Sequence, residues 1–249
     1  MVLFKTRTVP ILIDLDFTKC INLLDELEVS TREYDLKVWV DQISNLCRAY
    51  VSFHDGDFKS SLMHAEVSIA SPIKSGTLDP MDKGRLIRLV ACIGLITSDI
   101  KKIEKCAEDI LGIDNPDNLI VLDHAKSAIK SMQLLVHGEY NQAYELAKST
   151  IALEEASGRV GIASPFDCKF VVMRCLYEFS MINEALSEII SLREEAEQNG
   201  LKFIVILCEV GEIRILSRIP NSQDKVASKI NHLRNRITLN PEYESLSWL

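Results

Sequence analysis

Glycine, proline and aromatic residues are all scarce in this sequence. Its 249 residues include 10 glycines and 7 prolines, and aromatic residues make up 6% of the chain. A β-sheet protein needs more turns and more aromatic and β-branched pairs than this composition provides. Leu, Ile, Ala, Glu and Lys are abundant instead, and most of them favour helices. We therefore expect an all-α fold.

Long apolar runs and clustered positive charge are also missing. The apolar stretch from Val9 to Leu15 is interrupted by Pro10 and Asp14, and no run approaches the roughly 20 residues that span a bilayer. The formal net charge is −8, whereas tight binding to a nucleic-acid backbone depends on Lys and Arg. We expect no membrane segment and no direct binding of nucleic acid by this chain.

Motifs for metal, nucleotide and cofactor chemistry are absent as well. The seven cysteines form no CxxC pair, the five histidines show no HExxH motif, and no GxxxxGK phosphate loop occurs. The segment 158–161 contains two glycines but lacks a dinucleotide fingerprint, so we interpret it as a surface loop. Cys168 and Cys175 lie seven residues apart on one helix face, which predicts core packing rather than a reactive pair. We expect reduced thiols, a cytoplasmic location, and no catalytic, cofactor-binding or metal-binding residues.

A repeated pattern, by contrast, runs through most of the chain. Segments that begin at Gly56, Ser98, Gly138 and Ser180 each carry an apolar residue two places on and a small or apolar residue five places on. We call this last position the packing slot; it is occupied by Ser61, Ile103, Ala143 and Ala185, and a weaker copy from Ser222 places Ala227 there. Successive slots are 42, 40, 42 and 42 residues apart. Such regular spacing indicates an internal structural repeat.

Each repeat reads as a pair of helices. Apolar residues continue after the slot at helical spacing, and Asp79-Pro80, Asn115-Pro116 and Ser164-Pro165 each place a capping side chain before a proline. The expected pairs are 35–53 with 57–70, 81–96 with 99–111, 116–136 with 140–156, 165–179 with 182–198, and 201–216 with 223–237, preceded by an unpaired helix at 17–28. The chain is thus one domain: an N-terminal segment at 1–34, repeats at 35–237 and a tail at 238–249.

The pattern of Gly138, Tyr140 and Ala143, echoed by Gly56 and Phe58, resembles the second half of a tetratricopeptide (TPR) repeat. The Trp and Leu-Gly signature of the first TPR helix is absent, and the period of 40 to 42 residues exceeds the usual value of about 34. Longer units of this kind resemble the repeat region of bacterial transcriptional activators of the maltose-regulator (LuxR-type) class. In that family the repeats lie between an ATP-binding domain and a DNA-binding helix-turn-helix. The resemblance implies a right-handed superhelical α-solenoid of about five TPR-like units.

Helical solenoids offer an extended concave face for partners. The candidates for groove residues are Lys83, Arg85 and Arg88. They lie on the first helix of a pair, which lines the inner surface in this architecture. They could bind the carboxylate of a ligand, and the alternative interpretation is that they are ordinary surface charges. We expect a non-catalytic scaffold for a protein, peptide or small-molecule effector, in the regulatory region of a transcriptional regulator. The alternative is a stand-alone peptide-sensing receptor or adaptor, which an Asn-rich groove would favour. Whether the chain forms a homo-oligomer is left open. A helical enzyme would require a convergent cluster of titratable groups, which the spacing does not provide.

Overall fold

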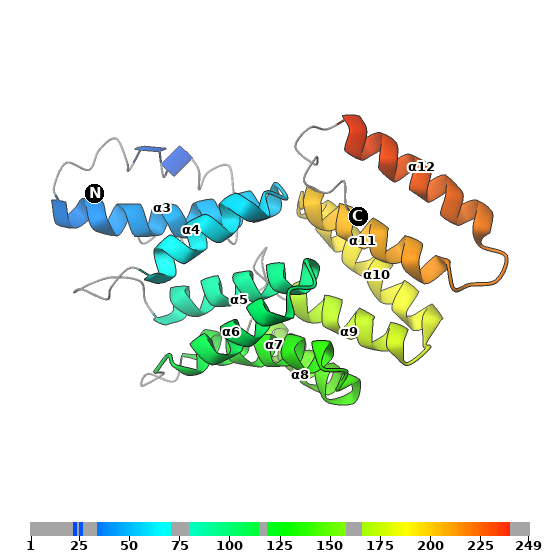
Figure 1. Ribbon diagram of the computed structural model, residues 1–249, viewed down its shortest axis with the longest axis horizontal. Helices are drawn as coiled ribbons and strands as arrows, with labels where there is room; N and C mark the ends of the chain where they lie inside the picture. The colour runs from blue at the N-terminus through cyan, green and yellow to red at the C-terminus, as the bar shows by residue number, and fades with distance from the viewer. Residues whose placement is uncertain are drawn as a thin grey trace.

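The computed structural model describes residues 22–23, 25–26, 34–70, 80–114, 119–157 and 166–239, and every regular element within these ranges is helical. Figure 1 labels the helices in chain order. They are α3 (Tyr34–His54), α4 (Phe58–Ala70), α5 (Pro80–Ile96), α6 (Ile100–Leu111), α7 (Ile120–Val136), α8 (Tyr140–Ala156), α9 (Phe166–Glu178), α10 (Ile182–Gln198), α11 (Lys202–Leu216) and α12 (Gln223–Leu239). The all-α prediction is confirmed for the described residues.

Most helix boundaries agree with the expected ones to within two residues. The exception is α7, which was expected from residue 116 and begins at Ile120; residues 115–118 lie outside the described ranges. The caps Asp79, Asn115 and Ser164 and the loop at 158–161 also lie outside them. Of the expected helix at 17–28, residues 22–23 and 25–26 are described, and they are helical.

The turns inside the first four helix pairs share one backbone geometry. In each turn a residue adopts a left-handed conformation, as Gly138 does at φ +80°. The N–H of Gly138 donates to the carbonyl of Leu135 at 3.1 Å, and the N–H of Glu139 donates to that of Leu134 at 2.9 Å. These two hydrogen bonds close the end of α7 as a Schellman motif. The same two bonds recur at Gly56, Ser98 and Ser180.

The fifth pair corrects one packing residue. In this turn the left-handed residue is Asn221, at φ +60°, and not Ser222. The packing slot therefore falls five places after Asn221, at Val226, whose N–H donates to the Ser222 carbonyl at 2.9 Å. Ala227, expected in the slot, is exposed. In contrast, Ser61, Ala143 and Ala185 are each fully buried.

The helices follow one another around an arc (Figure 1), so that α11 returns to contact α3. Phe203 of α11 makes this contact, and it is fully buried. Its ring stacks edge-on against Phe53 at a centroid distance of 6.0 Å and against Phe58 at 5.1 Å. Gly56 allows this approach, because a Cβ atom there would lie 3.1 Å from the Phe203 ring. Aromatic packing thus joins the first described helix pair to the fifth.

Within the described ranges, no helix combines the length and the apolar character required to cross a membrane. The cysteines in these ranges are buried and free of disulfide bonds, as expected. They are Cys47, Cys92, Cys106, Cys168, Cys175 and Cys208.

Candidate functional site

The three basic residues expected in a groove lie in different environments. Lys83 and Arg85 are partly exposed on α5, and the Arg85 guanidinium lies 3.6 Å from the Asp82 carboxylate. Arg88 points inward, and 12% of its side chain is exposed. Of the three, Arg88 lines the pocket described below. The candidate site is therefore built around Arg88.

Arg88 joins three helices through hydrogen bonds to two carboxylates. Its Nε and Nη2 atoms donate to the two oxygens of Asp167, at the start of α9, each at 2.6 Å. Its Nη1 donates to Glu154 Oε1, near the end of α8, at 2.5 Å, and Nη2 donates to Glu154 Oε2 at 3.4 Å. These four bonds use four of the five guanidinium N–H donors. Little donor capacity is left for the carboxylate of a ligand.

The charges in this cluster are deeply buried, since 4% of the Asp167 side chain and 5% of the Glu154 side chain are exposed. Burial alone would lower the pKa of Arg88, but the charge and hydrogen bonds of Asp167, and to a smaller extent the charge of Glu154, hold that pKa well above its usual value. A guanidinium that donates two parallel bonds to a carboxylate is among the stronger ion pairs in proteins. Arg88 is therefore a permanent cation that fixes α5 against α8 and α9.

Two further side chains complete the cluster. His124 of α7 is buried, and its Nδ1 atom lies 4.0 Å from Glu154 Oε1. Its Nε2 atom has no hydrogen-bond partner among the described residues. Cys168 lies beside Arg88, with its Sγ atom 3.9 Å from Nη2. Burial, reinforced by the charge of Asp167, raises the pKa of this thiol well above its usual value, so Cys168 is not a reactive thiolate.

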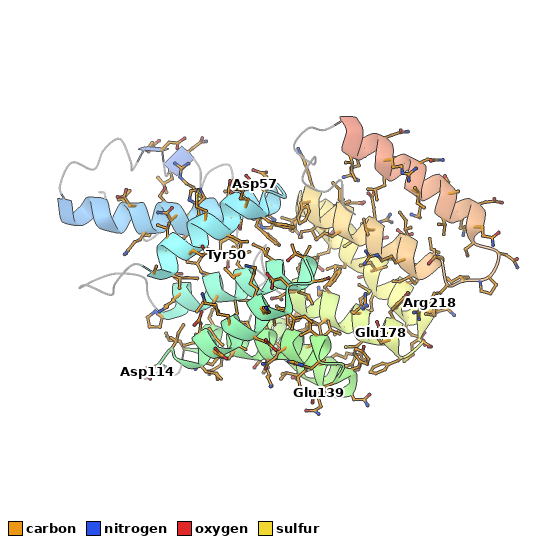
Figure 2. All side chains as sticks on the ribbon, viewed as in Figure 1. Tyr50, Asp57, Asp114, Glu139, Glu178 and Arg218 are labelled. Carbon is orange, nitrogen blue, oxygen red and sulfur yellow. The ribbon has the colours of Figure 1, made fainter. Side chains whose placement is uncertain are left out.

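A pocket opens next to this cluster and contains about 380 Å³ of empty space, part of it open to solvent. Four helices contribute to it, and each is the first helix of a pair: α3, α5, α9 and α11. The lining residues are Tyr50, Phe53, His54, Arg88, Leu89, Cys92, Phe166, Asp167 and Ile204. Figure 2 shows Tyr50 inside the molecule between α3 and α5, whereas Glu139 lies at the outer edge. The pocket is thus on the inner side of the arc.

Most of the pocket wall is aromatic or aliphatic. His54 contributes no positive charge at neutral pH, because burial lowers its pKa to about 3. The hydroxyl of Tyr50 donates to the backbone carbonyl of Arg85 at 3.2 Å, which fixes this ring at the edge of α5. The charged groups in the lining are therefore Arg88 and Asp167, which bind each other.

Sequence reasoning identified one member of the cluster and missed the others. Asp167 fits the pattern of an acidic residue in the first turn of a helix, where its charge stabilises the helix N-terminus. That role accounts for Asp167 without any partner elsewhere in the sequence. Glu154 and His124 occupy positions on their helices that periodicity does not distinguish from surface positions. They lie 66 and 36 residues from Arg88 in the sequence, so no local motif connects them. A buried position for Glu154, between Leu153 and Glu155, could be found only from the packing of α8.

The arrangement places the Arg88–Asp167 ion pair beside an apolar pocket wall, where it can orient a small polar group. No group of three or more His, Cys, Asp or Glu side chains that could hold a metal ion occurs in the described ranges. Comparison with protein-family models, curated proteins and solved structures gave no match. The function must therefore be inferred from the residues of the site.

Proposed function

We propose that this chain is a non-catalytic binding module, which holds an effector in the pocket on the inner side of the arc. One observation carries the proposal: the pocket is lined by the first helix of four different pairs. In helical-repeat proteins, corresponding helices of successive units form the concave binding face. A ligand here would contact α3, α5, α9 and α11 at once, and would stabilise their arrangement.

The architecture that we propose is a right-handed superhelix of five TPR-like units. The repeated left-handed turn residues at Gly56, Ser98, Gly138, Ser180 and Asn221 support it. They are 42, 40, 42 and 41 residues apart, which is the period of the sequence pattern. The first four of these turns also close with the same two hydrogen bonds, so they reverse the chain in the same way.

The biological role that we propose is the effector-sensing region of a transcriptional regulator resembling the maltose-regulator class. The effector is a protein, a peptide or a small molecule, and this chain binds no nucleic acid itself. Free, buried thiols in the described ranges fit a cytoplasmic location. A peptide-sensing receptor is the second candidate, but the pocket lining contains no asparagine of the kind that holds a peptide backbone.

A binding screen tests the proposal. Purified protein is screened against a library of short random peptides and against a library of small-molecule fragments, and the affinity of each binder is measured by fluorescence anisotropy or calorimetry. We then measure the same binders on Leu89→Phe, in which a larger side chain fills part of the pocket. We expect their affinity to fall at least about tenfold, since the added ring occupies ligand space.

The matched control is Leu153→Phe on α8, where 55% of the leucine is exposed. It adds the same ring away from the pocket and should leave affinity unchanged. Circular dichroism checks that both variants remain folded. The proposal is refuted if neither library yields a binder, or if the binders retain equal affinity for both variants.

A further inference from the structure

The pocket has an open acceptor for a positively charged ligand. Asp167 Oδ1 accepts hydrogen bonds from Arg88 Nη2 and from the N–H of Cys168, at 2.6 and 2.7 Å. Asp167 Oδ2 accepts one bond, from Arg88 Nε, and the neighbouring Cys168 thiol, a weak donor that a ligand can displace, interacts with the same carboxylate. A carboxylate oxygen can accept two hydrogen bonds. The Asp167 carboxylate, in the pocket lining, can therefore take one more donor.

The charge balance of the cluster favours a cation over an anion. One guanidinium, that of Arg88, faces two carboxylates, and it bonds to Glu154 on the side away from the pocket lining. The N-terminus of α9 offsets about half a charge on Asp167. Apart from His124, whose Nδ1 atom lies 4.0 Å from Glu154 Oε1, the balance of these charges is negative, and an uncompensated charge at such low exposure is costly. An added cation would stabilise this arrangement, whereas an added anion would oppose it.

We propose that the pocket binds an ammonium group carried on an apolar body, with Asp167 Oδ2 as its hydrogen-bond acceptor. Tyr50, Phe53 and Phe166 supply aromatic rings to the same pocket. The faces of such rings attract cations, most strongly in a site shielded from water. This inference rests on the proposed binding function and specifies the chemistry of its ligand.

The size of the pocket fits this chemistry. Its empty space of about 380 Å³ includes a part that is open to solvent. An ammonium group can enter while its apolar body lies against Leu89 and Ile204, which line the same pocket. The ammonium can belong to a free amine or to a lysine side chain of a peptide. The two sources share the same recognition chemistry, and separate probes distinguish them.

Three probes of similar shape test the charge preference: phenethylamine, 2-phenylethanol and 3-phenylpropionate. Nα-acetyl-lysine-N-methylamide and its ε-acetylated form test a lysine source. Dissociation constants are measured at neutral pH by following amide chemical shifts in NMR titrations. We expect at least one amine to bind about tenfold or more tightly than its uncharged analogue, and 3-phenylpropionate to bind most weakly.

Two variants locate the binding. Asp167→Asn removes the charge while Arg88 keeps its bonds to Glu154, and Phe166→Leu removes one ring. Each should weaken amine binding at least about fivefold. The controls are Glu195→Gln, which removes a carboxylate paired with Lys169 away from the pocket, and Tyr144→Leu, which removes a ring packed on Phe179; both should leave amine binding unchanged.

The result separates this inference from the proposed function. If 2-phenylethanol or 3-phenylpropionate binds in the pocket as tightly as phenethylamine, the binding function stands and the preference for a cation is refuted. The inference is also refuted if neither amine binds, or if Phe166→Leu and Asp167→Asn both bind amines like the wild type. Chemical shifts that move at α3, α5, α9 and α11 place the amine in the pocket.

Discussion

Replacing Arg88 with methionine tests whether the buried cluster holds the helix pairs together. Methionine keeps most of the side-chain volume but removes the charge and all four hydrogen bonds to Glu154 and Asp167. The two carboxylates then remain buried without their cation. Removing one partner of a buried ion pair costs about 3 to 5 kcal/mol. Since a typical domain has a stability of about 5 to 15 kcal/mol, Arg88→Met should lose a large share of the total.

Urea unfolding at pH 7, followed by far-UV circular dichroism, measures this loss. The matched control is Arg174→Met, because Arg174 pairs with Glu178 on the helix surface and 45% of its side chain is exposed. That exposed pair should be worth less than about 1 kcal/mol. The triple variant Arg88→Met, Glu154→Gln, Asp167→Asn should recover part of the stability, because it removes the orphaned charges. A loss below about 1 kcal/mol in Arg88→Met would show that water or another cation already compensates the carboxylates.

Other properties of the chain give three further expectations. Ala185→Leu should overpack a fully buried position and lower the free energy of unfolding by about 1 to 3 kcal/mol. Ala227→Leu, at an exposed position, should change this free energy by less than about 0.5 kcal/mol. Equal effects of the two variants in urea unfolding would contradict the assignment of the fifth packing slot to Val226. Gly56→Ala and Gly138→Ala each place an alanine in a left-handed backbone conformation, which should lower the stability by about 1 kcal/mol. Gly56→Ala should lower the melting temperature more, because its new Cβ atom meets Phe203, whereas nothing lies within 4 Å of a Cβ atom at Gly138. Burial raises the pKa of the Cys175 and Cys208 thiols to about 12, so these thiols ionise in the unfolded chain before they ionise in the folded protein as the pH rises above about 9. The free energy of unfolding should therefore fall between pH 9 and 12, and it should fall less in a variant with fewer buried cysteines.

Local sequence signals are sufficient to predict the helices of this protein. Apolar periodicity sets the length of α8 and α10, whose ends match the expected ones at Tyr140, Ala156, Ile182 and Gln198. Both the helix pairs and their turns depend on interactions within a few residues. Such interactions appear in the sequence as composition and spacing, so they can be found without a structure.

The repeat alignment was shifted by one residue where the local signal was ambiguous. Ser222 resembles Ser98 and Ser180, which are the left-handed residues of their own turns. In the fifth turn Asn221 takes the left-handed conformation instead, as asparagine does more readily than most residues. Within the helix pairs, the left-handed residue, and not the small side chain, therefore fixes the position of the slot. That property cannot be read from residue size.

The candidate site depends on contacts between distant residues, which spacing alone does not contain. Arg88 and Asp167 are 79 residues apart, and their bond forms because α5 and α9 converge on the inner side of the arc. The inward position of Arg88 on a first helix could be suspected from the repeat. Its two carboxylate partners could not, because the choice among many acidic residues depends on the three-dimensional path of the chain.

The contact of Phe203 with Phe53 has a consequence for how the chain folds. Linear repeat arrays contact only their neighbours, so their end units can open independently while the rest stays folded. Here a contact between residues 150 positions apart joins the two ends of the arc. Closing so long a loop is entropically unfavourable, so we expect this contact to form after the local helix pairs. Once formed, it couples the opening of α3 to that of α11, and hydrogen exchange at the two helices should slow together.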